Sequence, residues 1–188
     1  QCDVDAIGWT SMAVEAEMLA AAADVLQKLG FNDFKIVVNH RKLLNAMLNA
    51  SGIPATHHGA ALVAIDKVDK IGVEGVKKEF ADRGLAADAA DKLGEMLGGI
   101  RGVAGLDGLA LGEEGQLAIR ELKELFALSD QTSAGSHLEL DAYLARGLSY
   151  YTGPIFEIRV ADLAGSPLLN DLRHRRFPGQ VCDRLGFD

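Results

Sequence analysis

Two hydrophobic patterns follow one another at the start of the chain. Residues 1–8 alternate imperfectly between apolar and polar positions, which predicts a strand. Thr10 or Ser11 can cap the helix that follows, and Gly30 ends it. The apolar face of this helix is broad, so we expect the helix to be largely buried. Its two neighbouring apolar seams are Val14, Met18, Val25 and Leu29, and Met12, Leu19, Ala23 and Leu26.

A short strand and a second helix come next. Residues 34–38 form an apolar run rich in β-branched side chains, which is typical of a buried strand. Helical spacing returns over residues 41–50 and ends at Gly52 and Pro54. The order strand, helix, strand, helix predicts a core in which helices and strands are mixed.

The middle of the chain has helical spacing throughout. Residues 60–128 contain no pattern typical of a strand, and three helices are predicted there. Eight glycines lie between Gly94 and Gly115, where we expect a flexible connection. The apolar positions that mark the three helices are Val73, Val76 and Phe80, then Leu85, Leu93, Met96 and Leu97, then Ile119, Leu122, Leu125 and Phe126.

Strand-like alternation returns beyond the helical region. Residues 138–144 alternate as in a half-buried strand, and residues 156–160 alternate in the same way. Gly147 and Gly153 bracket the connection, so we predict that the two strands pair antiparallel. The predicted division is residues 1–55 for the first part of a core, residues 56–132 for a helical insertion and residues 133–188 for the second part of the core.

Composition and charge narrow the class of protein. The chain has 188 residues, of which 48% are hydrophobic and 24% charged, values that suit a globular protein with a buried core. No apolar run approaches the roughly 20 residues that span a bilayer. The net charge of −8 argues against a general nucleic-acid-binding surface. The dense basic cluster at 173–176 is most simply a solvated tail, although it leaves local RNA contact open.

The cysteines do not indicate a metal site. Cys2 and Cys182 lie at opposite ends of the chain, and no paired Cys or His spacing is typical of zinc. Two reduced thiols in a cytoplasmic protein are the simplest interpretation, and nothing in the sequence requires a disulfide.

The segment from residue 145 to residue 153 carries the densest chemistry. Arg146 can bind a phosphate or carboxylate through two parallel hydrogen bonds, and glycine lets backbone approach a ligand closely. Tyr150 and Tyr151 would point to opposite faces of an extended segment. From the residues alone, a binding site and a well-packed hairpin both remain open.

Residues 146–153, Arg-Gly-Leu-Ser-Tyr-Tyr-Thr-Gly, resemble the signature hairpin of histidine–tRNA ligases, with Ser149 where that family usually has aspartate. Residues 1–8 resemble the closing strand of the family's second class-defining motif. The resemblance covers roughly residues 1–165. It implies an α+β, class II synthetase-like fold, with an antiparallel sheet, flanking helices and an inserted helical module, incomplete at both ends. Residues 65–72 and 76–79 also resemble segments of one bacterial branch.

The resemblance implies a role for five side chains. Gln1 matches the glutamine that holds the α-amino group of L-histidine. Asp5 and Tyr151 match the residues that contact the imidazole from either side, and Tyr150 would flank the site. Arg146 matches the catalytic arginine at the α-phosphate of ATP. From the residues alone, Asp3 and Asp5 are more simply a strand-end pair with no ligand, or a weak metal site.

The same resemblance implies the substrates and partners, and leaves alternatives. It implies ATP with Mg²⁺, L-histidine and histidine tRNA as substrates, and a cytoplasmic homodimer. The family's other two motifs would lie before Gln1 and after Asp188, and a family glycine-rich stretch is lacking near residue 166, so we expect weak or absent aminoacylation by this chain alone. The alternatives are a histidine-sensing regulatory subunit of ATP phosphoribosyltransferase and a non-catalytic interaction module.

Overall fold

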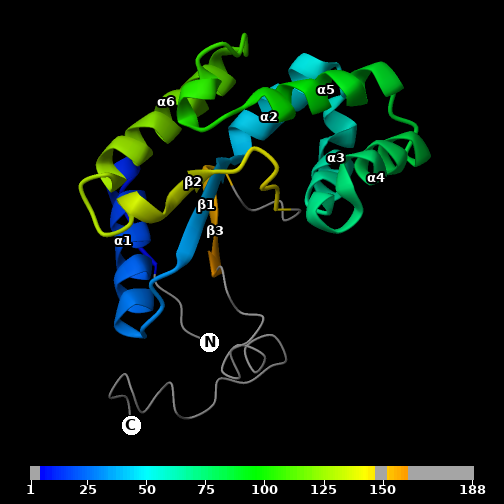
Figure 1. The fold of residues 1–188 in the computed structure, drawn as a ribbon. Helices are drawn as coiled ribbons and strands as arrows, with labels where there is room; N and C mark the ends of the chain where they lie inside the picture. Colours follow the sequence, from blue (N-terminus) through cyan, green and yellow to red (C-terminus); the bar gives the residue numbers. More distant parts are fainter. Residues whose placement is uncertain (1–4, 147–151, 161–188) are drawn as a thin grey trace.

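The computed structural model describes residues 5–146 and 152–160, which form six α-helices and a three-stranded sheet (Figure 1). The α+β fold class is therefore confirmed. The helices are α1 (Met12–Lys28), α2 (Arg41–Ser51), α3 (His58–Ile65), α4 (Val68–Asp82), α5 (Ala87–Gly99) and α6 (Glu113–Ser129), and the strands are β1 (Phe34–His40), β2 (Leu138–Leu140) and β3 (Pro154–Val160).

The sheet is mixed, with strand order β2-β1-β3. β1 pairs parallel with β2 and antiparallel with β3. The predicted antiparallel pairing of residues 138–144 with residues 156–160 is therefore wrong. The expected antiparallel pairing is present between β1 and β3, whereas β2 adds a parallel pair. Every residue of β1 except Lys35 is buried, and a strand covered on both faces takes the central position.

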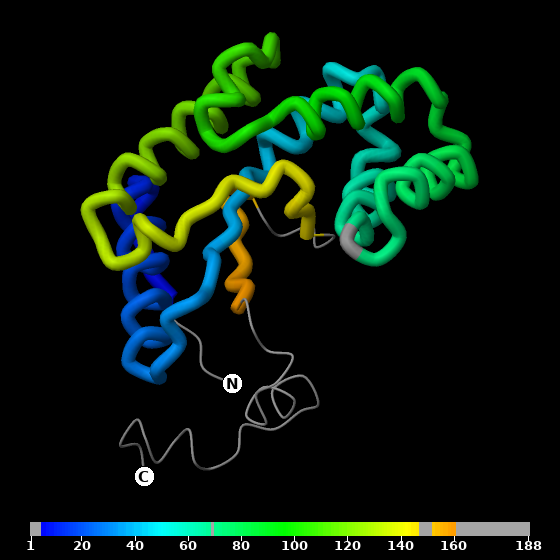
Figure 2. The backbone as a smooth tube through the Cα atoms, in the orientation of Figure 1, coloured from blue at the N-terminus to red at the C-terminus, as the bar shows by residue number. Residues whose placement is uncertain are grey.

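β2 is also shorter than predicted. It ends at Leu140, and the backbone N–H of Leu144 donates to the carbonyl of Asp141 in a turn. Residues 141–146 then continue past the end of β1 towards α3 and α4, as the yellow tube in Figure 2 shows. The alternation over residues 138–144 thus belongs to a short strand followed by a turn.

Helix α1 is capped as predicted but is less buried than predicted. The side chain of Ser11 accepts a hydrogen bond from the backbone N–H of Ala13. Leu19 and Ala23 are buried, whereas Val25, from the other apolar seam, is 48% exposed. The reason is that α1 packs mainly against α6 among the described elements, and α6 lies beside only part of α1 (Figure 1).

The start of the chain differs from the prediction as well. Residues 1–4 lie outside the described residues, and residues 5–8 are irregular and exposed. The predicted strand is therefore wrong over residues 5–8.

The glycine-rich segment is more ordered than predicted. α5 continues to Gly99, and Val103–Leu106 form a 3-10 turn in which Leu106 is fully buried. A buried leucine gives the connection an anchor in the core, so the expectation of a flexible connection is wrong for these residues.

Two helices of the middle region pack against the first part of the core. α6 packs against α1 and α2, and α5 packs against α2 as well as against α4, which also packs against α3. At Gly115 the backbone of α6 comes so close to α2 that an added Cβ would lie 2.7 Å from the Cβ of Ala46. Of the helices in the two described ranges, none has the length and apolar content to cross a membrane.

Candidate functional site

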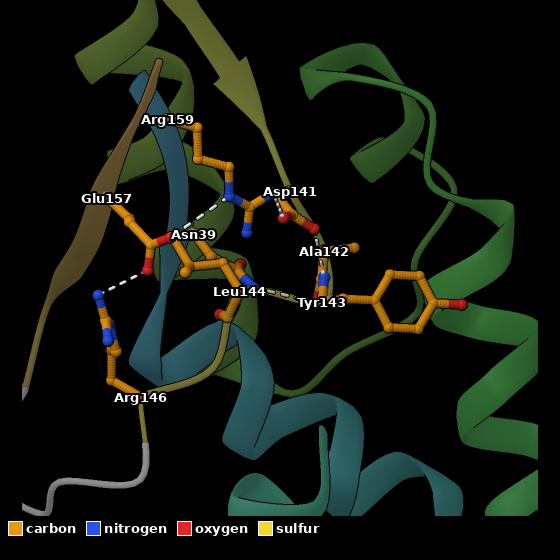
Figure 3. A network of polar contacts seen from close by, with 8 residues as sticks. All are labelled: Asn39, Asp141, Ala142, Tyr143, Leu144, Arg146, Glu157 and Arg159. Atoms are coloured by element: carbon orange, nitrogen blue, oxygen red, sulfur yellow. Dashed lines mark hydrogen bonds and ion pairs between the residues drawn. The ribbon is translucent and has the colours of Figure 1, made fainter. Parts of the chain in front are cut away.

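The two faces of the sheet differ in character. Side chains alternate along a strand, so Ile36 and Val38 of β1 lie on one face, where they join the hydrophobic core. The register pairs Val37 with Glu157, and Glu157 therefore lies on the opposite face, together with Asn39. That second face carries the polar network drawn in Figure 3.

Arg146 is held on this face by contacts to its backbone and to its side chain. The guanidinium of Arg41, at the start of α2, donates from Nη1 to the carbonyl of Arg146 at 2.8 Å. Nη2 of Arg146 lies 2.6 Å from Oε2 of Glu157 on β3. The side chain of Arg146 is 41% exposed, so it is both held and accessible.

Arg159 extends the network away from Arg146. Its Nη1 lies 2.8 Å from Oδ2 of Asp141, and its Nε lies 3.4 Å from Oε1 of Glu157 (Figure 3). The four groups thus alternate in sign in the order Arg146, Glu157, Arg159, Asp141. Their formal charges cancel, which leaves a neutral network in the absence of substrate.

Asn39 fixes the turn that leads to Arg146. It is 1% exposed, and its Nδ2 donates to the carbonyls of Ala142 at 3.1 Å and Leu144 at 3.0 Å. Its Oδ1 accepts from the backbone N–H of His40 at 2.8 Å. The sequence analysis missed Asn39, although an amide at the end of an apolar strand is a visible signal, because a buried polar group needs partners.

A cavity of about 270 Å³ lies beside the network. The further charged residues that line it are Asp66 and Lys70, which flank the start of α4. The helical region therefore borders the space in front of Arg146. The position of Lys70 was also missed, although its segment was part of the resemblance.

His40 links the same junction to α6. Its side chain is fully buried; Nδ1 accepts from the backbone N–H of Lys42 at 3.1 Å, and Nε2 lies 2.7 Å from Oε2 of Glu121. Burial lowers the pKa of His40, and the neighbouring Glu121 opposes that effect. The ring is therefore neutral with its proton on Nε2, which donates to Glu121.

The structure describes two of the five predicted site residues. Arg146 lies in the network, as above. Asp5 is exposed in an irregular segment, and its side chain makes no hydrogen bond or ion pair with another residue of the described ranges. Gln1, Tyr150 and Tyr151 lie outside those ranges, so the convergence of acid, phenol and guanidinium stays a prediction. Over residues 5–146 and 152–160, no group of three or more His, Cys, Asp or Glu side chains could hold a metal ion.

Comparison with known proteins decides the family. A profile of the family described as histidyl-tRNA synthetase matches residues 1–170. The chain belongs to the histidyl-tRNA synthetase family. The resemblance drawn from the sequence is thereby confirmed for nearly the whole chain, and Arg146 and its network lie within the matched residues.

Relatives within the histidyl-tRNA synthetase family are longer than this chain. The histidine–tRNA ligase of Gloeobacter violaceus is 39% identical over 173 residues, covering 88% of this chain and 37% of the relative. That of Leifsonia xyli subsp. xyli is 40% identical, covering 84% of this chain and 38% of the relative. The chain therefore spans a little over a third of these relatives.

Solved structures agree with the fold. The crystal structure of histidyl-tRNA synthetase from Nostoc sp. PCC 7120 has a TM-score of 0.74 at 25% identity, covering 81% of this chain and 37% of that one. A Bacillus halodurans structure, titled as an ATP phosphoribosyltransferase regulatory subunit/histidyl-tRNA synthetase, has a TM-score of 0.70 at 22% identity, covering 86% and 42%. The second similarity shows the fold alone.

Proposed function

We propose that the complete protein attaches L-histidine to histidine tRNA through a histidyl-adenylate, and that this chain supplies the arginine at the reacting phosphate. The observation that carries the proposal is the placement of Arg146. Its guanidinium is anchored by Glu157, remains 41% exposed, and lines a cavity of about 270 Å³ on the polar face of the sheet.

The chemistry of Arg146 suits the first step. The carboxylate of histidine attacks the α-phosphorus of ATP, the bond to the bridging oxygen breaks, and pyrophosphate leaves. Negative charge then grows on the α-phosphate oxygens, where a guanidinium with preorganised N–H donors stabilises it. Within the described residues Nη2 is bonded to Glu157, and a guanidinium has five N–H donors in total. Mg²⁺ enters bound to ATP, and we assign it no ligand from this chain.

Four other residues complete the proposed histidine pocket. Gln1 would hold the α-amino group, and Asp5 and Tyr151 would contact the imidazole, with Tyr150 beside them. A neutral imidazole has one donor and one acceptor, which a carboxylate and a phenol can satisfy. An amino acid that lacks these groups would leave the pocket's polar atoms unpaired, which is the basis of the proposed specificity.

The domain division is part of the proposal. We retain residues 56–132 as the inserted helical region between two parts of the core, 1–55 and 133–188. α6 packs against α1 and α2 of the core, and α5 also packs against α2, which favours α3 and α4 as the separable part of that region. Its contribution of Asp66 and Lys70 to the cavity supports a role next to the tRNA end that receives histidine. We further propose that the protein acts in the cytoplasm as a homodimer.

Histidine-dependent exchange of pyrophosphate into ATP by the complete protein tests the proposal. We expect Arg146→Ala to lower kcat about 10²- to 10³-fold, the usual loss when one donor to a developing charge is removed. Arg120→Ala, at an exposed position of α6, is the matched control and should leave exchange unchanged. Exchange that depends on another amino acid, or none at all, would refute the assignment; a histidine sensor would bind histidine without exchange.

A further inference from the structure

We propose that Glu157 is a positioning residue that sets the orientation of the Arg146 guanidinium; this inference rests on the function proposed above. Arg146 lies on irregular backbone, so regular hydrogen bonding does not fix the direction of its side chain. Glu157, in contrast, lies in the middle of β3, which pairs with β1 along its whole length. The 2.6 Å hydrogen bond from Nη2 of Arg146 to Oε2 of Glu157 therefore holds a long arginine side chain against a strand that is paired along its whole length.

The carboxylate of Glu157 is itself held from the other side. Its Oε1 lies 3.4 Å from Nε of Arg159, whose Nη1 lies 2.8 Å from Oδ2 of Asp141. Oδ1 of Asp141 accepts from the backbone N–H of Tyr143 at 2.9 Å. The chain of contacts therefore runs through Arg159 and Asp141 and ends on the backbone N–H of Tyr143.

The sign of its charge argues that Glu157 does not bind the phosphates of ATP directly and acts on them through Arg146. A carboxylate repels the phosphates of ATP and the carboxylate of histidine. Removing it would leave the guanidinium of Arg146 without this anionic partner. An anion would then be attracted at least as well, but the direction of the guanidinium would no longer be fixed. We therefore expect a loss in kcat without a rise in the KM for ATP.

Two substitutions in the complete protein test this division, with histidine-dependent pyrophosphate exchange as the assay. Glu157→Ala should lower kcat about 10- to 100-fold, the effect of misplacing a catalytic group by about 1 Å. Glu157→Gln should lose less, because an amide oxygen can still accept from Nη2. Glu139→Ala is the matched control: this carboxylate lies on the same face of the sheet, is 59% exposed and lies 3.9 Å from Lys35.

A double-mutant cycle separates positioning from a general structural role. If Glu157 acts through Arg146, adding Glu157→Ala to Arg146→Ala should change kcat less than about twofold. A loss in the double variant equal to the product of the two single-variant losses would overturn the inference, as would full activity of Glu157→Ala. Should Glu157→Ala fail to fold, Glu157→Gln in both backgrounds decides the question. Absence of histidine-dependent exchange in the unsubstituted protein would instead refute the proposed function.

Discussion

Asn39→Ala should destabilise the protein strongly, because it removes three hydrogen bonds from a buried position. The carbonyls of Ala142 and Leu144 lose their donor, and the backbone N–H of His40 loses its acceptor. A buried polar group left without a partner costs about 1–3 kcal/mol. For three such groups, some of which regain water, we expect the free energy of unfolding to fall by about 3–5 kcal/mol.

Urea unfolding followed by circular dichroism measures this loss. Asn49→Ala is the control, since Asn49 is an exposed amide on α2 and its removal should change stability by less than about 0.5 kcal/mol. Asn39→Asp keeps an acceptor for the N–H of His40 but loses both donors, so it should also be destabilising. A loss below about 1 kcal/mol for Asn39→Ala would refute the argument that these bonds hold the turn before Arg146.

Two further predictions concern the packing of α6. Burial lowers the pKa of His40. As pH falls below about 6.5, the unfolded chain therefore takes up a proton that the folded chain does not. The free energy of unfolding then falls by at most about 1.4 kcal/mol per pH unit. His40→Asn, which keeps a capping acceptor, should reduce that slope in urea unfolding at several pH values; an unchanged slope would contradict the assignment. Gly115→Ala should lower stability by about 1–3 kcal/mol, because its Cβ would lie 2.6 Å from the Cβ of Leu111 and 2.7 Å from that of Ala46. Gly94→Ala in α5 is the control; no atom lies within 4 Å of its added Cβ, and it should raise the free energy of unfolding by up to about 1 kcal/mol. Similar effects of the two substitutions would count against close packing of α6 on α2.

The sequence predicted local structure better than strand pairing. β1 and α2 were placed within a residue or two, because each is a single run with a clear period. The partners of β2 and β3 were predicted wrongly because a period gives the face of a strand but not its neighbour. β1 is about a hundred residues from β2 along the chain. Nothing in the alternation of residues 138–144 shows that β1 lies between β2 and β3.

The candidate site was predicted in part for a similar reason. Arg146 stood out because a short motif carries it. Glu157 and Arg159 were visible as the polar positions of a strand, but their pairing with Arg146 and Asp141 depends on the fold. The glycine-rich segment was misjudged because glycine content indicates backbone freedom, whereas the burial of Leu106 is what orders the segment.

Residues at and just after the end of β1 contact both the turn before Arg146 and helix α6. Side chains of consecutive strand residues point to opposite faces, so Asn39 reaches the turn before Arg146 while His40 reaches Glu121 in the helical layer. Arg41, the next residue, donates from its side chain to the carbonyl of Arg146 and from its backbone to that of Gly153. Three consecutive residues thus fix the turn, α6 and the backbone on both sides of residues 147–151. A substitution that loosens α6 at Glu121 therefore acts on His40, one residue away from Arg41, whose guanidinium holds the carbonyl of Arg146.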